Sequence, residues 1–160
     1  EEDTFEKKNI VDQNEEKAIS LRTEMDALIF ELSNSPNLVK PPRINVGTLY
    51  ENPVYLNRND ASGQRGVWNQ EQVFSFWKVD IKEGVYDLKF KFLKSLKGGG
   101  EMFLEVGQLI LKKHNPMAGV DLLEWKGVTL PQGSFDFTPF YKKEQRSNYF
   151  PLWVEIERVD

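Results

Sequence analysis

The chain has 160 residues, of which 39% are hydrophobic and 29% charged, and its formal net charge is −4 at pH 7. This length supports one domain with a substantial core, and the composition is that of a globular protein rather than a disordered one. The acidic balance argues against a general nucleic-acid binder, and scattered basic pairs such as Lys112-Lys113 and Lys142-Lys143 are expected on solvated faces. The absence of cysteine excludes disulfides, thiol catalysis and cysteine-based metal sites. No apolar run approaches the roughly 20 residues of a membrane span.

The first part of the chain predicts an amphipathic helix over residues 12–32. Its apolar residues are spaced three and four apart, on one stripe of a helix: Ala18, Leu21, Met25, Leu28 and Leu32. Asp12 followed by Glu15 resembles a helix-start capping arrangement, and Pro36 is expected to end the helix. One helix of this length cannot bury its stripe alone, so we expect it to dock on a partner. The chain opens on Glu1 without methionine, which predicts a fragment or a processed start.

After a proline-stiffened linker, the hydrophobic period changes from that of a helix to that of a strand. Residues 73–81 and the alternating segment around Tyr86 are predicted to be strands that form a hairpin through Lys82-Glu83-Gly84. Further strands are predicted at residues 102–106, 109–112, 125–130, 134–138 and 152–159. Short strands punctuated by glycine and proline, with no second helix, predict a mainly β fold: an antiparallel β-sandwich or jelly roll preceded by one helix.

The sequence indicates no catalytic residue, cofactor or metal site in this chain. His114 is the only histidine and is expected in a loop, and without cysteine a transition-metal site is not expected. Gly98-Gly99-Gly100 lacks the Lys-Ser/Thr ending of a phosphate-binding loop and predicts a hairpin turn instead. Most carboxylates alternate with apolar residues, which predicts that they lie on the outer faces of the sheets.

Residues 57–70 are unusually dense in side chains that form planar, bidentate hydrogen bonds. Arginine forks suit sulfate and carboxylate groups, whereas Asn, Asp and Gln suit sugar hydroxyls. The substrate-contact candidates are Arg58, Asn59, Asp60, Arg65 and Trp68. Two interpretations stay open: a ligand-contacting loop, or a loop whose polar side chains satisfy its own backbone. Trp77 and Trp153 are expected in the core, while Trp68 is expected to be the most exposed tryptophan.

Three short motifs, taken in order, resemble one enzyme family. Asp3-Thr4-Phe5-Glu6-Lys7-Lys8-Asn9-Ile10 resembles the Asp-Pro-x-Glu-x-x-Asn-Leu segment near the end of formylglycine-dependent sulfatases, with Thr4 where proline is usual. Residues 51–60, followed by Gly66-Val67-Trp68, are similar to the passage that enters the C-terminal β-sandwich of arylsulfatase-like enzymes of Bacteroidetes-type bacteria. The predicted hairpin from Trp77 to Leu88 is similar as well, and is also common in carbohydrate-binding jelly rolls.

The resemblance implies an organisation and a function for the chain. Residues 1–35 would be a helical segment from the end of the catalytic region, residues 36–47 a linker, and residues 48–160 an accessory β-sandwich. The family makes its formylglycine nucleophile from a Cys/Ser-x-Pro-x-Arg motif that this chain lacks. Formylglycine, calcium and the catalytic residues are therefore expected in a missing N-terminal domain. The implied function is completion of a sulfuric ester hydrolase that is periplasmic or extracellular, with that domain and a sulfated glycan as partners.

Two other functions remain open. An independent carbohydrate-binding module would need an exposed aromatic platform, for which Trp68 and Trp125 are the candidates. A protein-interaction domain would place the N-terminal helix in a groove of a partner. The apolar stripe of residues 18–32 argues against a free carbohydrate-binding module, because such a module has no need of it.

Overall fold

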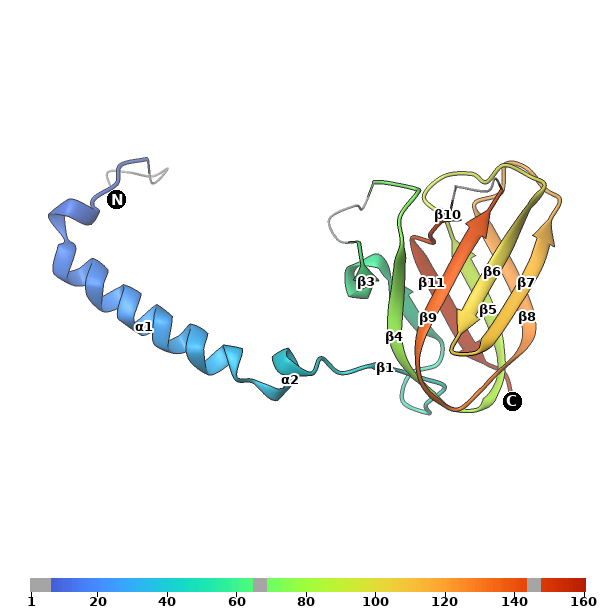
Figure 1. The fold of residues 1–160 in the computed structure, drawn as a ribbon, viewed down its shortest axis with the longest axis horizontal. Coiled ribbons are helices and arrows are strands. Elements are labelled where there is room, and N and C mark those ends of the chain that lie inside the picture. The colour runs from blue at the N-terminus through green and yellow to red at the C-terminus, as the bar shows by residue number, and fades with distance from the viewer. Residues whose placement is uncertain (1–6, 65–68, 144–147) are drawn as a thin grey trace. The chain divides into compact units, whose positions relative to one another are not determined.

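The computed structural model describes residues 7–64, 69–143 and 148–160. The chain divides into two units, Glu1–Pro42 and Arg43–Asp160. The first unit is helical and the second is a β-sandwich, so the predicted mainly β fold with one long N-terminal helix is confirmed (Figure 1).

The helical unit contains the 3₁₀ helix η1 (Val11–Gln13), helix α1 (Glu15–Ser33) and the short helix α2 (Pro36–Val39). Helix α1 begins later than residue 12 because Asp12 belongs to η1, whose turn is closed by the bond from the Asn14 amide to the Val11 carbonyl. No side chain caps the first turn of α1, so the predicted capping arrangement is wrong. Within this unit no described side chain is buried.

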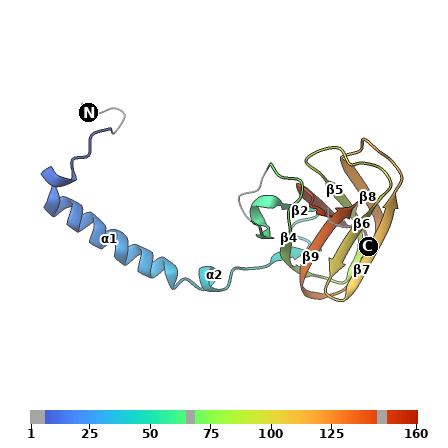
Figure 2. The same ribbon diagram turned by 45° about the horizontal axis from the view of Figure 1, so that its top comes forward.

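The sandwich consists of two sheets whose strands form two layers (Figure 2). The larger sheet contains β1 (Ile44–Val46), β3 (Ser62–Gly63), β4 (Ser75–Ile81), β6 (Gly100–Val106), β7 (Leu109–Asn115), β9 (Gly133–Lys142) and β10 (Asn148–Tyr149). The smaller sheet contains β2 (Val54–Asn57), β5 (Gly84–Lys91), β8 (Leu122–Leu130) and β11 (Trp153–Arg158). The main orders are β1-β4-β9-β6-β7 and β2-β11-β5-β8, and every pair is antiparallel except β1 with β4.

The core lies between the two sheets, where the inward-facing residue of each strand alternates with an outward-facing one. Trp77 is fully buried, as predicted; its indole donates a hydrogen bond to the Asn57 carbonyl at 2.6 Å, and its ring stacks on Phe150. Trp153 is only half-buried and contacts Tyr55 edge-on at 6.1 Å between ring centroids. The prediction of a core position is therefore confirmed for Trp77 but not for Trp153.

Two predicted hairpins are wrong, although the strands themselves exist. Strand β4 pairs with β9 in the larger sheet, whereas β5 pairs with β11 and β8 in the smaller one, so Lys82-Glu83-Gly84 carries the chain from one layer to the other. The Gly98-Gly99-Gly100 segment likewise ends a connection between sheets, from β5 in the smaller sheet to β6, which begins at Gly100 in the larger one. In both cases the two successive strands lie in opposite sheets and turn their apolar faces toward the same core. Period-two alternation shows that each strand has a buried face, but it does not show whether the two strands pair with each other.

The sandwich unit begins earlier than the predicted boundary at residue 48. Strand β1, which lies inside the predicted linker, pairs in parallel with β4 and places Val46 opposite Ile81. Val46 is fully buried, so this strand contributes to the core. The predicted loop position of His114 is also wrong, because this residue lies in strand β7 opposite Glu101.

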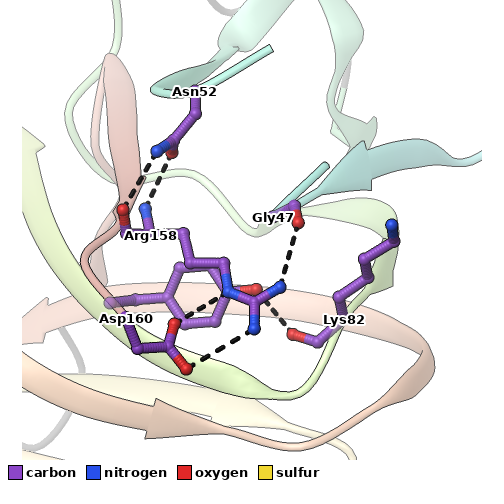
Figure 3. Close-up of polar contacts among 6 residues, drawn as sticks. Gly47, Asn52, Lys82, Arg158 and Asp160 are labelled. Carbon is purple, nitrogen blue, oxygen red and sulfur yellow. Dashed lines mark hydrogen bonds and ion pairs between the residues drawn. The ribbon is translucent and has the colours of Figure 1, made fainter. Parts of the chain in front are cut away.

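The C-terminal residues close one end of the sandwich through hydrogen bonds (Figure 3). The backbone amide of Arg158 donates to the Asn52 side chain at 2.8 Å, and the Asn52 amide group donates back to the Arg158 carbonyl at 2.9 Å. The Arg158 guanidinium donates to Asp160 at 2.8 Å and to the Gly47 carbonyl at 3.3 Å. Gly47 itself has φ +80°, and a Cβ there would lie 2.0 Å from the Tyr86 hydroxyl oxygen, so only glycine fits. This cluster fastens the segment after β1 to the last strand.

Candidate functional site

A pocket of about 130 Å³ lies at the opposite end of the sandwich, where β5 ends and β11 begins. In Figure 1 this is the end at which β10 lies. Its walls come from parts of the chain that are distant in sequence: Arg58, Glu71, residues 92–97, Tyr141 with Lys143, and Tyr149 with Phe150. The loops at the end of a sandwich are where such a scaffold presents binding residues.

Arg58 lines this pocket, and its guanidinium is hydrogen-bonded to the backbone. It begins the 3₁₀ helix η2 (Arg58–Asp60), is only 9% exposed, and directs its guanidinium toward the segment that leads into β11. Its Nε donates to the Pro151 carbonyl at 3.1 Å, Nη1 to the Gln70 carbonyl at 2.7 Å and Nη2 to the Phe150 carbonyl at 2.5 Å. Burial lowers the pKa of this guanidinium from its ordinary value. Arg58 therefore holds two segments of backbone, at Gln70 and at Phe150-Pro151, and adds a positive charge to the pocket lining.

The polar side chains next to Arg58 form hydrogen bonds within their own loop. The Asn57 side chain accepts a hydrogen bond from the Asn59 amide at 2.8 Å and donates one to the Asp60 carboxylate at 2.7 Å. Asn59 and Asp60 are exposed and are not among the residues that line the pocket. For these two candidates the geometry favours the interpretation in which the loop satisfies its own backbone.

The remaining two sequence candidates, Arg65 and Trp68, lie outside the described residues. The structure thus brings only Arg58 of the five candidates into the pocket wall, in a position that fixes backbone segments.

Sequence reasoning missed the lysines of the pocket. Lys94, Lys97 and Lys143 all line it, and Lys94 forms an ion pair with Glu71 at 3.5 Å. Among the described residues, Lys97 and Lys143 have no acidic partner within 4.0 Å. Lys142-Lys143 was expected to lie on a solvated face, and Lys143 is indeed exposed; the sequence signal for its place in the pocket was its position just after a strand rich in aromatic residues.

The floor of the pocket is aromatic and held in place by hydrogen bonds. Tyr141 is buried, donates its hydroxyl proton to the Lys97 carbonyl at 2.6 Å and accepts from the Gly100 amide at 3.0 Å. A Cβ at position 100 would lie 2.4 Å from that hydroxyl oxygen, which explains a glycine at the start of β6. Phe92 meets the Tyr141 ring edge-on at 6.1 Å, and the half-buried Tyr149 lies 6.4 Å from it.

Two further hollows lie between β7 and β8, with volumes of about 360 and 500 Å³. Lys113 and Trp125 line both of them, and His114 lines the first. Trp125 is only 5% exposed and meets Phe90 edge-on at 5.3 Å, so it offers no free face on which a sugar ring could stack. Of the two candidates for an aromatic platform, this leaves Trp68, which is not described.

The described residues form no group of three or more histidine, aspartate or glutamate side chains with the geometry of a metal site. No helix in the described part of the chain combines the length and the hydropathy that crossing a bilayer requires. No protein-family model matches the chain, and a search of curated proteins gives no match.

Proposed function

We propose that this chain is the C-terminal accessory portion of a formylglycine-dependent sulfatase. In this proposal α1 docks on an N-terminal catalytic domain, and the sandwich completes the enzyme and shapes its cleft for a sulfated glycan. The order of the three sequence motifs supports the proposal, together with a fold in which one helix precedes a β-sandwich. The chain would not hydrolyse sulfate esters alone.

The observation that carries the proposal is the apolar stripe of α1, which has no core within its own unit. Leu21, Met25 and Leu28 are 52%, 53% and 55% exposed. A helix stabilised by an amphipathic face needs another surface to cover that face. The 19 residues of α1 make a rod of roughly 28 Å, enough to lie along one side of a catalytic domain.

The formylglycine and the calcium that the resemblance implies belong to the proposed catalytic domain. This chain has no cysteine, and its described residues present no metal-ligand group. Its contribution to substrate selection would come from the segment of Arg58, Asn59, Asp60, Arg65 and Trp68. Arg58 would act there by holding the pocket wall, because its guanidinium is bonded to backbone carbonyls. The family resemblance places the parent enzyme in the periplasm or outside the cell.

The proposal can be tested by joining the chain to a formylglycine-dependent α/β domain that has been cut before its own Asp-Pro-x-Glu-x-x-Asn-Leu segment. We expect a soluble protein that hydrolyses a chromogenic aryl sulfate. Leu21→Asp with Leu28→Asp should abolish solubility or activity, because both charges fall on the docking stripe. Thr23→Asp, on the opposite face of α1, is the matched control and should have no effect. Activity that survives the stripe variant would contradict the docking role of α1.

A second candidate function is an independent carbohydrate-binding module. The observation that favours it is that Arg43–Asp160 is compact, has its own core and contains the pocket entirely. A glycan-binding screen of residues 43–160 beside a sulfatase assay of the full chain separates the two. Glycan binding with no hydrolysis supports the module, whereas neither activity is expected of an accessory portion. Hydrolysis by the chain alone would refute both.

A further inference from the structure

We infer that the pocket lined by Lys97, Lys143 and Tyr149 binds a single ring that bears an oxyanion, namely a sugar unit with a carboxylate or a sulfate group. The inference goes beyond the sulfatase proposal and concerns only side chains of the sandwich; binding by the chain alone would favour the second candidate function, the carbohydrate-binding module. A module of any parent protein could use such a site.

The charge of the pocket is opposite to that of the molecule. The chain as a whole has a net charge of −4, yet the pocket is lined by four basic side chains, Arg58, Lys94, Lys97 and Lys143. Among its described lining residues, Glu71 is the only acid, and it is engaged by Lys94. Lys97 and Lys143 are exposed and have no acidic partner among the described residues, while the Arg58 guanidinium is buried. Such a concave, positively charged site concentrates anions and strengthens charge-assisted hydrogen bonds to them.

The floor and the size of the pocket restrict the anion to a ring-sized molecule. Phe92, Tyr141 and Phe150 are buried beneath it, and the half-buried ring of Tyr149 forms part of the wall. The three buried rings offer no free face, so the half-buried Tyr149 is the ring that can meet the C–H face of a sugar, a contact that inorganic sulfate cannot make. The volume of about 130 Å³ is below the roughly 300–1,000 Å³ of clefts for drug-sized ligands, so one ring with its charged substituent is the expected occupant.

The pocket is also built in advance of any ligand. Three hydrogen bonds from Arg58 hold the carbonyls of Gln70, Phe150 and Pro151, and the Tyr141 hydroxyl fixes the Lys97 carbonyl. The backbone is thus held by hydrogen bonds at Lys97 and around Phe150, while the ammonium groups of Lys97 and Lys143 are exposed. A site that is ordered before binding loses less conformational entropy when the ligand arrives.

The test is a titration of the full-length, ¹⁵N-labelled chain, followed by amide chemical shifts at constant ionic strength. Four probes are used: D-galacturonate, D-galactose 6-sulfate, neutral D-galactose and inorganic sulfate. We expect the two acidic sugars to shift the amides of residues 93–97 and 149–150, with galactose and inorganic sulfate binding at least about tenfold more weakly. The tighter of the two acidic sugars then assigns the charged group as carboxylate or sulfate.

Two double variants test whether the acidic sugar binds in this pocket. Lys97→Ala with Lys143→Ala should raise the Kd by about tenfold or more, because two charge-assisted contacts are lost. Lys113→Ala with Lys126→Ala removes the same charge from the β7–β8 hollows and should change the Kd by less than about twofold. All four side chains are exposed, so both variants should keep the dispersed spectrum of the folded sandwich. Equal binding of galactose, equal binding of inorganic sulfate, or unchanged affinity of the Lys97/Lys143 variant would each overturn the inference.

Discussion

The helical unit and the sandwich both have periodic apolar patterns, but only the sandwich buries the apolar residues of its pattern within its own unit. In the sandwich, residues far apart in sequence meet across strand pairs, such as Val46 with Ile81 and Leu88 with Ile156, and all four are buried. In the helical unit, Leu21 and Leu28 lie on a stripe with no partner among the described residues of that unit. A hydrophobic period therefore identifies an element and the face that it can bury, but not the surface that covers this face.

The largest effect should come from a cavity in the sandwich core. Leu104 is fully buried in β6, so Leu104→Ala should lower the free energy of unfolding by about 2–5 kcal/mol. All four tryptophans belong to the sandwich unit, so their fluorescence in urea reports this unit alone. The matched control is Leu28→Ala on α1, for which the same measurement should show almost no change. Equal effects of the two substitutions would contradict the contrast between the units.

The next largest effect concerns Arg58. Arg58→Met removes the donor of hydrogen bonds to the buried carbonyls of Phe150 and Pro151 and to the Gln70 carbonyl, and should cost about 2–3 kcal/mol of stability in the same urea experiment. Arg58→Lys keeps the charge but not the planar fork, and should recover only part of that loss. If Arg58→Met left the stability in urea unchanged, the assignment of Arg58 to the pocket wall would be refuted.

A smaller effect should follow from pH through Glu155 on the outer face of the smaller sheet. Lys89 donates a hydrogen bond to this carboxylate at 2.6 Å and Tyr55 donates another at 2.5 Å; these bonds hold the pKa of Glu155 below its ordinary value. A lowered folded-state pKa means that the stabilisation is complete above the ordinary value, about 4.5, and is lost as pH falls through the lowered value.

We therefore expect the urea midpoint to fall on acidification below about pH 4.5, and Glu155→Gln to be less sensitive over the same range. The lowered pKa values of Asp121, beside Lys91, and Asp160, beside Arg158, leave some acid sensitivity in the variant. An identical pH profile for both proteins would show that the Glu155 contacts do not contribute.

The smallest effect is expected from removing the helical unit. Among the described residues, the buried apolar ones all lie at or after Val46, so deletion of residues 1–42 should change the stability of the sandwich by less than about 0.5 kcal/mol. Deletion of residues 1–47 is the sharper control. It also removes β1 and the buried Val46, and should cost about 2 kcal/mol or more. Equal stability of the two truncations would contradict the boundary at Arg43.

Much of the fold could be predicted because local pattern sufficed for it. The spacing of residues 18–32 predicted α1, and alternation predicted the inner faces of β4 and β5. Short segments escaped prediction: β1 and β2 have three and four residues, too few to establish a period. The chain's path between sheets was mispredicted for a different reason, since a short turn can join paired strands or cross from one layer to the other.

The candidate site was predicted less well than the fold. Residue chemistry drew attention to Arg58, but its guanidinium is used to hold backbone carbonyls. The lysines that line the pocket were not singled out, because Lys94, Lys97 and Lys143 are ordinary surface residues when read along the sequence. They converge only where the segment after β5 meets the end of β9.

Local pattern and composition were enough to predict one long helix and strands with defined inward faces, and to exclude cysteine chemistry. These properties depend on neighbouring residues and on composition alone. Only the tertiary structure decided which strands pair, that β1 joins the core, and that four basic side chains surround an aromatic hollow. Those outcomes depend on contacts between residues that are distant in the chain, and the free energy of such contacts is set by packing and register rather than by local pattern.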